Sequence, residues 1–231
     1  FKEAFELLDR VVGLYTALGD EHNAGRALIQ KGTYAGFNNQ PATAIELICR
    51  GLSLVDQERE PRLYLSSLLN LLSFMVDEGS YRAARIHLWR LKPAFLAEGG
   101  GTRSLLQLRW LEGRIDAGLE KFDRAEAAFR ETKAGFEESD EVYSAALVSM
   151  DLAALLLRQG RMDEVLELAE AQIATFRALR IAREAVAVLL IICRDCKKQQ
   201  ATLDQIETAV MMLKELERQP VRQATGDGLR A

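Results

Sequence analysis

The chain has 231 residues, and 48% of them are apolar, which is enough for a sizeable core in one or two domains. Its 30 basic and 34 acidic residues are interleaved, give a formal charge of −4 and form no basic stripe typical of a nucleic-acid surface. The longest apolar run, residues 185–192, is too short to cross a bilayer, and three cysteines do not indicate a disulfide framework. We therefore expect a cytoplasmic protein that binds neither nucleic acid nor a membrane.

The spacing of apolar residues predicts an all-α fold. Leu105, Leu108 and Leu111 follow a helical period, and no sustained alternation typical of a strand occurs. Turn-forming stretches recur at short intervals, and Pro41 and Pro61 suit the first turn of a helix.

In chain order, residues 2–18 are expected to form the second helix of a pair whose first helix lies upstream, so that the chain is a fragment of a longer protein. Five helical hairpins follow. Their expected bounds are about 20–56, 60–97, 102–137, 140–178 and 181–217. Pro93 should kink or end its helix within the second hairpin. Residues 218–231 are polar, contain glycine and are expected to form a disordered tail.

A spacing of turn, small and large residues recurs in the hairpins at offsets of 40, 41 and 40 residues. The four copies run from Asn39 to Ile48, Gly79 to Leu88, Glu120 to Phe129 and Gly160 to Ala169. The helix upstream of each copy has a matching position, which is occupied by Gly32, Leu72, Gly113 and Ala153. A hairpin of this size cannot bury its apolar face alone, so we expect stacked copies to build a continuous core.

With Gly113, Phe122, Ala125 and Phe129 at their positions in the third copy, the pattern resembles the tetratricopeptide repeat (TPR) in a long form of about 40 residues. The small residues would let two helices approach closely, and the large ones would fill the space beside them. The resemblance implies a right-handed α-solenoid of antiparallel helix hairpins over residues 1–217, similar to the TPR arrays of bacterial multidomain regulators. Armadillo and HEAT repeats, with periods of about 40 to 47 residues, are the alternative.

In the TPR family, peptides bind in a concave groove lined by the first helix of each hairpin. The resemblance therefore implies a non-enzymatic protein-interaction module, acting as a scaffold or sensor for a protein or peptide partner. It assigns partner binding to Arg26, Gln30, Thr33, Asn70, Ser73, Gln107, Trp110, Arg114, Met150 and Asp151. The same repeat positions also hold apolar residues, which would give the groove a hydrophobic floor: Ile29, Leu69, Leu111 and Leu147.

Three of these residues have a second interpretation. Trp110 suits a binding hot spot, or packs between helices if the register shifts by one residue. Asn70 and Arg114 are interpreted either as partner-binding residues or as ordinary residues that are solvated or form hydrogen bonds within a repeat. Only Asn70 matches the two-carboxylate clamp of the chaperone-tail-binding TPR proteins, so we do not expect that class of client.

Two motifs invite a chemical interpretation. Cys193 and Cys196 form a CxxC pair, but other zinc ligands lie in distant repeats and the pair lies late in a predicted helix, so helix packing is preferred. The glycine-rich residues 99–102 could hold an anion but lack the lysine of a P-loop, and are interpreted as a turn. We predict no enzymatic activity, no metal and no cofactor.

Three other functions stay open. The array could be a sensor whose curvature changes when a small molecule or signalling peptide binds, and which controls an effector domain upstream. Exposure of residues 1–18 could make copies stack as a homodimer or a longer assembly. An enzyme stays open only if Cys193 and Cys196 prove reactive.

Overall fold

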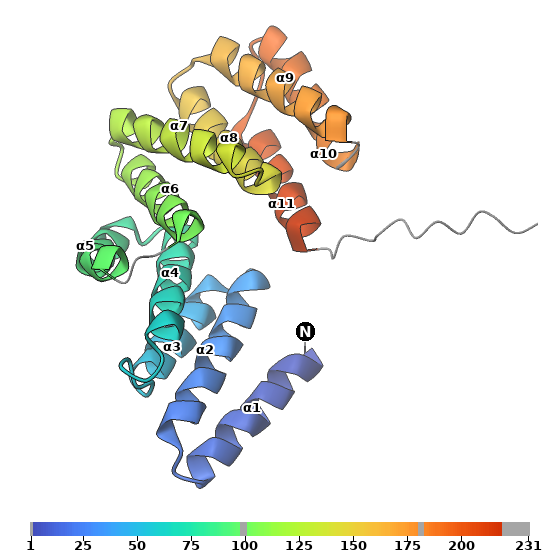
Figure 1. Ribbon diagram of the computed structural model, residues 1–231. Helices are drawn as coiled ribbons and strands as arrows, with labels where there is room; N and C mark the ends of the chain where they lie inside the picture. Colours follow the sequence, from blue (N-terminus) through green and yellow to red (C-terminus); the bar gives the residue numbers. More distant parts are fainter. Residues whose placement is uncertain (1, 98–100, 180–182, 219–231) are drawn as a thin grey trace, which may run out of the picture. The chain divides into compact units, whose positions relative to one another are not determined.

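The computed structural model describes residues 2–97, 101–179 and 183–218. Within these ranges the chain forms eleven α-helices and no strand (Figure 1), which confirms the all-α prediction. The chain divides into two compact units, unit 1 (Phe1–Ala128) and unit 2 (Phe129–Ala231). One right-handed solenoid over residues 1–217 stays a prediction.

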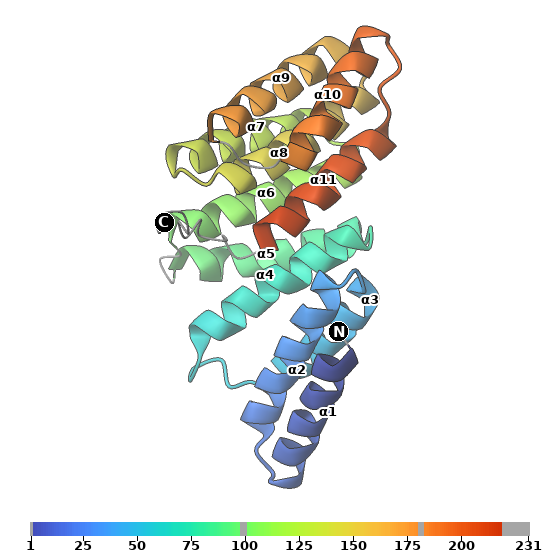
Figure 2. The same cartoon turned by 90° about the vertical axis from the view of Figure 1, so that its right-hand side faces the viewer.

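Unit 1 contains six complete helices. They are α1 (Lys2–Ala17), α2 (Glu21–Phe37), α3 (Pro41–Leu52), α4 (Pro61–Asp77), α5 (Tyr81–Ala97) and α6 (Thr102–Gly118). Each helix packs against the next, and α4 also packs against both α2 and α6 (Figure 2). Helices α2, α4 and α6 are therefore neighbours in chain order. Helix α7 (Phe122–Glu138) crosses from unit 1 into unit 2.

Unit 2 contains four complete helices. They are α8 (Val142–Arg158), α9 (Met162–Leu179), α10 (Arg183–Lys197) and α11 (Leu203–Arg218). Each packs against the next, and α11 also returns to pack against α8. In unit 2 the first and last of the four helices are therefore in contact. In unit 1 the contacts between helices that are not consecutive are those of α4 with α2 and α6.

The turn inside the hairpins has one recurring conformation. Positive φ angles of 61°, 85°, 59° and 73° occur at Asn39, Gly79, Glu120 and Gly160. The following residue in each copy donates its N–H to a carbonyl five positions back, over 2.8 to 3.1 Å, as from Gln40 to Ala35. This is a Schellman motif, which satisfies the last carbonyls of the first helix and reverses the chain. The copies found in the sequence therefore share one backbone geometry.

The small residues of the repeat lie where two helices meet. A methyl group added to Gly32 in α2 would lie 3.0 Å from the carbonyl oxygen of Ala44 in α3. The matching position in the second helix of every copy is fully buried, at Ala44, Ala84, Ala125 and Val165. At Gly32 the close contact of α2 with α3 therefore leaves no room for a side chain.

The core is apolar in both units. In unit 1 it includes Ile48, Leu72, Phe74, Leu88 and Ile115. In unit 2 the largest fully buried side chains include Phe136, Leu152, Phe176, Leu189 and Ile192. None of the described helices combines the length and the apolar character needed to span a membrane.

The prolines have two different positions. Pro41 and Pro61 begin α3 and α4, as predicted, because the first N–H groups of a helix have no acceptor within it. Pro93 does not end its helix, since α5 continues to Ala97. Of the two predicted effects, the helix end was wrong and the kink stays a prediction. Pro93 has no N–H to donate within α5, and the residues two positions before and after it, Leu91 and Phe95, are buried.

Two predictions lie wholly or largely outside the described residues. They are the disordered tail, of which only Arg218 is described, and the glycine-rich turn at 99–102, of which residues 99 and 100 are not described.

Candidate partner-binding surface

Eight of the ten predicted partner-binding residues lie in unit 1, on helices that pack side by side. All eight are exposed or half-buried. We call this set the α2–α4–α6 surface: Arg26, Gln30 and Thr33 on α2, Asn70 and Ser73 on α4, and Gln107, Trp110 and Arg114 on α6. The fold therefore brings these accessible side chains onto three adjacent helices.

The other two predicted residues, Met150 and Asp151, lie on α8 in unit 2. Met150 is only 1% exposed, because α8 packs against both α9 and α11. It is not available to a partner, contrary to the prediction. Asp151 is half-buried and stays a candidate of unit 2 alone.

The predicted hydrophobic floor is not accessible. Its four residues, Ile29, Leu69, Leu111 and Leu147, are all buried. Ile29, for example, packs where α2 meets α3, since a methyl group on Gly51 would lie 2.7 Å from its side chain. The α2–α4–α6 surface is therefore mainly polar, and half-buried Trp110 is its aromatic member.

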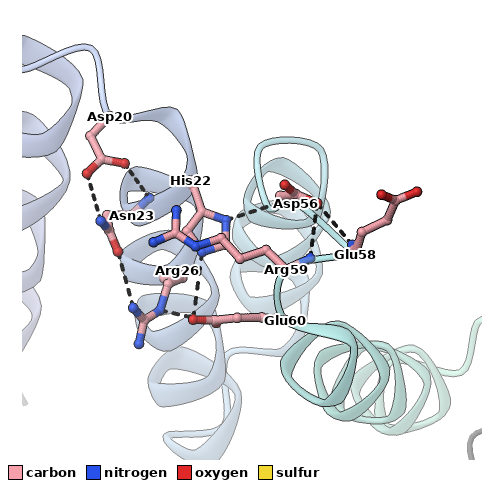
Figure 3. Close-up of polar contacts among 8 residues, drawn as sticks. All are labelled: Asp20, His22, Asn23, Arg26, Asp56, Glu58, Arg59 and Glu60. Atoms are coloured by element: carbon pink, nitrogen blue, oxygen red, sulfur yellow. Dashed lines mark hydrogen bonds and ion pairs between the residues drawn. The ribbon is translucent and has the colours of Figure 1, made fainter.

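Arg26 is oriented by a polar network at the start of α2 (Figure 3). Its Nε lies 3.4 Å from Oε2 of Glu60, and a terminal nitrogen donates to Oδ1 of Asn23 over 3.2 Å. The side chain of Asn23 donates to Asp20 over 2.7 Å, and Asp20 caps α2 by accepting the backbone N–H of Asn23. These hydrogen bonds from Asn23 hold the pKa of Asp20 below its usual value. Arg26 therefore helps to join α2 to the residue that precedes α4.

The same network ties α2 to the turn between α3 and α4 (Figure 3). Nδ1 of His22 accepts the backbone N–H of Asp56 over 3.1 Å, and Oδ1 of Asp56 accepts the N–H groups of Glu58 and Arg59. Nε2 of His22 is buried, has no hydrogen-bond partner among the described residues, and lies 3.7 Å from Oε1 of Glu60. The network fixes the turn against α2 and so positions the start of α4.

Arg114 has a structural contact as well as an accessible position. It donates to Oδ1 of Asp77 over 2.8 Å and so links α6 to the end of α4. The sequence left open whether Arg114 is a binding residue or a hydrogen-bonding residue within the array, and the second role is observed. Replacing it with an acidic residue would place two carboxylates together.

On the side of α6 that faces α5, an ion-pair cluster joins the two helices. Glu112 accepts hydrogen bonds from Lys92 over 2.6 Å and from Arg109 over 3.0 Å, and Arg85 pairs with Asp116. Burial opposes the ionisation of Glu112, but the bonds from Lys92 and Arg109 outweigh it, so the pKa of this carboxyl lies below its usual value. The cluster therefore stabilises the contact between α5 and α6 while Glu112 is charged.

The cysteine pair lies in a core. Cys193 and Cys196 are free thiols buried near the end of α10, and burial raises the pKa of both. A raised pKa disfavours the thiolate that redox and metal chemistry require. Within residues 2–97, 101–179 and 183–218, no group of three or more His, Cys, Asp or Glu side chains is arranged to hold a metal ion.

Helix α5 exposes an aromatic residue that the sequence analysis did not single out. Trp89 on α5 is 78% exposed, whereas the sequence drew attention to Trp110. A signal was present in the sequence, because α5 carries a second line of apolar residues on the side opposite the one that fills the core.

Compared with known proteins, the chain matches no protein-family model, and no curated protein resembles it at a significant level. Function is therefore inferred from the fold and its surfaces.

Proposed function

We propose that this chain is a non-enzymatic, TPR-like interaction module that binds a peptide or protein segment on its α2–α4–α6 surface, as the scaffold or sensor part of a larger bacterial regulatory protein in the cytoplasm. The observation that carries the proposal is the presence of eight accessible side chains on three adjacent helices. The TPR-like assignment rests on the spacing of residues in the sequence; the copies share one turn geometry and one fully buried position.

The chemistry of this surface suits the main chain of an extended segment. Each of the three helices contributes one amide side chain, Gln30, Asn70 or Gln107, which can donate and accept a hydrogen bond. Neighbouring helices pack roughly 8–10 Å apart, and an extended chain rises about 3.3 Å per residue. A segment of about six residues would therefore cross all three helices, with side chains contacting Trp110 and Arg26.

The test is affinity capture from a lysate of the source organism, with the wild-type chain and a Gln30→Glu, Asn70→Glu variant. Both positions are accessible. A matched control, Thr175→Glu with Thr208→Glu, adds the same charge at exposed positions of α9 and α11. We expect a protein that the wild type and the control retain and the variant loses. Identical captures by variant and control would contradict the proposal.

A second candidate function is that of a sensor for a small molecule or signalling peptide. It is favoured by a cavity of about 520 Å³ between α9 and α10, a size within the range of ligand sites. The lining combines apolar side chains, among them Ile173 and Leu190, with the cationic Arg177 and Lys197 and the acidic Glu170. Ligand-induced compaction in small-angle scattering, without a macromolecular partner, would support the sensor over the interaction module.

A further inference from the structure

Helix α5 has an apolar line on each of two opposite sides. The first faces the core of unit 1 and is buried: Ala84, Leu88, Leu91 and Phe95. The second is accessible, with Ile86 55%, Trp89 78% and Leu96 58% exposed, and Pro93 exposed between them. Their spacing of three and four residues places these side chains on one face of the helix. We call Ile86, Trp89, Pro93 and Leu96 the outer stripe of α5.

The charge of α5 is entirely basic, with four Lys and Arg residues and no Asp or Glu. Arg85 and Lys92 are paired with carboxylates of α6. Arg82 and Arg90 are exposed, and neither forms an ion pair with any residue that the structure describes. Arg82 lies one turn before Ile86 on the same face, and Arg90 lies beside the stripe. The outer stripe is therefore bordered by positive charge that no described side chain neutralises.

We propose that the outer stripe of α5 docks an acidic amphipathic helix of a partner protein. From Ile86 to Leu96 the stripe is about 15 Å long, at 1.5 Å per residue, and so matches about three turns of a second helix. Apolar anchors at helical spacing are the usual means by which such a helix is recognised. Trp89 supplies the residue type most enriched in binding hot spots, and carboxylates beside the partner's apolar face would pair with Arg82 and Arg90.

The charges disfavour two other occupants. A second copy that docked α5 against α5 would place like charges opposite each other. An anionic membrane would attract the arginines, but the formal charge of −4 on the whole chain opposes its approach to a negative surface. A short acidic helix covers much less of the protein than a membrane does, so it interacts mainly with the positive charges of α5. The outer stripe shares no residue with the α2–α4–α6 surface, so this inference does not rest on the proposed function.

The experiment uses a synthetic helical peptide with leucine along one face and glutamate elsewhere, and a lysine counterpart as its control. In a Trp110→Phe chain, Trp89 is the remaining tryptophan of the two, so its fluorescence reports on the stripe. We expect the glutamate peptide to bind and to shift this emission to the blue, and the lysine peptide to do neither. In the otherwise wild-type chain, Trp89→Ala should weaken binding of the labelled glutamate peptide about tenfold or more. Met211→Ala, which truncates an exposed apolar residue of α11, should leave it unchanged.

A charge reversal makes the test specific. Arg82→Glu combined with Arg90→Glu should abolish binding of the glutamate peptide and create binding of the lysine peptide. Both residues are exposed, so the circular dichroism of the variant should equal that of the wild type.

Four outcomes would overturn the inference. The first is that the wild type does not bind the glutamate peptide. The second is that the Trp89→Ala variant binds this peptide as tightly as the wild type does. The third is binding to phosphatidylserine vesicles without binding to the peptide, which would assign the stripe to a membrane. The fourth is self-association that Trp89→Ala abolishes while the peptide does not bind, which would assign the stripe to a second copy.

Discussion

Gly25 of α2 and Gly51 of α3 meet backbone to backbone: a methyl group added to Gly25 would lie 2.7 Å from the carbonyl oxygen of Gly51. The relation is mutual, because a methyl group on Gly51 would lie 2.7 Å from the carbonyl oxygen of Gly25. Backbone atoms cannot rotate away as a side chain can, so neither position accepts a side chain without moving the two helices apart.

Gly25→Ala should therefore destabilise the chain by about 1 to 3 kcal/mol, even though alanine favours a helix more than glycine does. The control is Gly13→Ala in α1, where an added methyl group meets nothing within 4 Å. That change should stabilise the chain by about 0.5 to 1 kcal/mol. Urea unfolding measures both, and a Gly25→Ala chain as stable as the wild type would contradict the close contact.

The ion-pair cluster between α5 and α6 should make stability depend on pH. Because the pKa of Glu112 is lower in the folded chain, its stabilisation is fully present above the unfolded value, near 4.5, and is lost as the pH falls through the folded pKa. At neutral pH, Glu112→Gln should cost about 1 to 2 kcal/mol, because Lys92 and Arg109 lose a charged acceptor.

The pH effect is measured by urea unfolding of the wild type, of Glu112→Gln and of Glu167→Gln, which changes an exposed carboxylate of α9. The Glu112→Gln chain should lose less stability than the other two as the pH falls from neutral to below 4.5. Three parallel profiles would show that Glu112 does not carry the effect.

The three cysteines should differ in reactivity. Cys49 is exposed, whereas Cys193 and Cys196 are buried. Burial raises the pKa of the Cys193 and Cys196 thiols, and partial desolvation raises that of Cys49 although its side chain is exposed, so the reaction with a thiol reagent is best followed at mildly alkaline pH. We expect Cys49 to react in the native chain and the other two only after unfolding. Reaction of Cys193 and Cys196 as fast as Cys49 would contradict their burial and would strengthen the enzyme alternative.

The cap of α2 provides a test of the network in Figure 3. Asp20→Ala removes the oxygen that accepts the backbone N–H of Asn23 over 3.1 Å, so the first turn of α2 should open more often. Asp20→Asn keeps an equally good capping oxygen and should behave as the wild type. Hydrogen exchange at the amide of Asn23 distinguishes the two variants, and equal protection in both would argue against the cap.

The helices could be predicted from the sequence because their signals are local. Pro41 and Pro61 begin helices, and Asn39 and Gly160 form turns, for reasons contained within a few neighbouring residues. The burial of Met150 depends instead on α11 packing against α8, a contact between helices far apart in the chain. Local spacing does not specify such a contact.

The exposure of the tryptophans was equally hard to predict. The spacing of the repeat assigned Trp110 to a binding face. It does not predict how much of this side chain is covered when α6 packs against α4 and α5. Trp89 lies on α5, the second helix of its hairpin. The repeat pattern predicts that the large residues of this helix are buried between helices, but only one side of α5 is buried. Which side of an amphipathic helix stays uncovered is decided by tertiary packing.

Hydrogen–deuterium exchange of the chain, with and without a protein that it captures, tests the proposed interaction most directly. The account predicts slower exchange in α2, α4 and α6 when the partner is bound, with α9 and α10 unchanged. Protection confined to α9 and α10, with α2, α4 and α6 exchanging as in the free chain, would contradict it and would favour the cavity between α9 and α10 as the functional site.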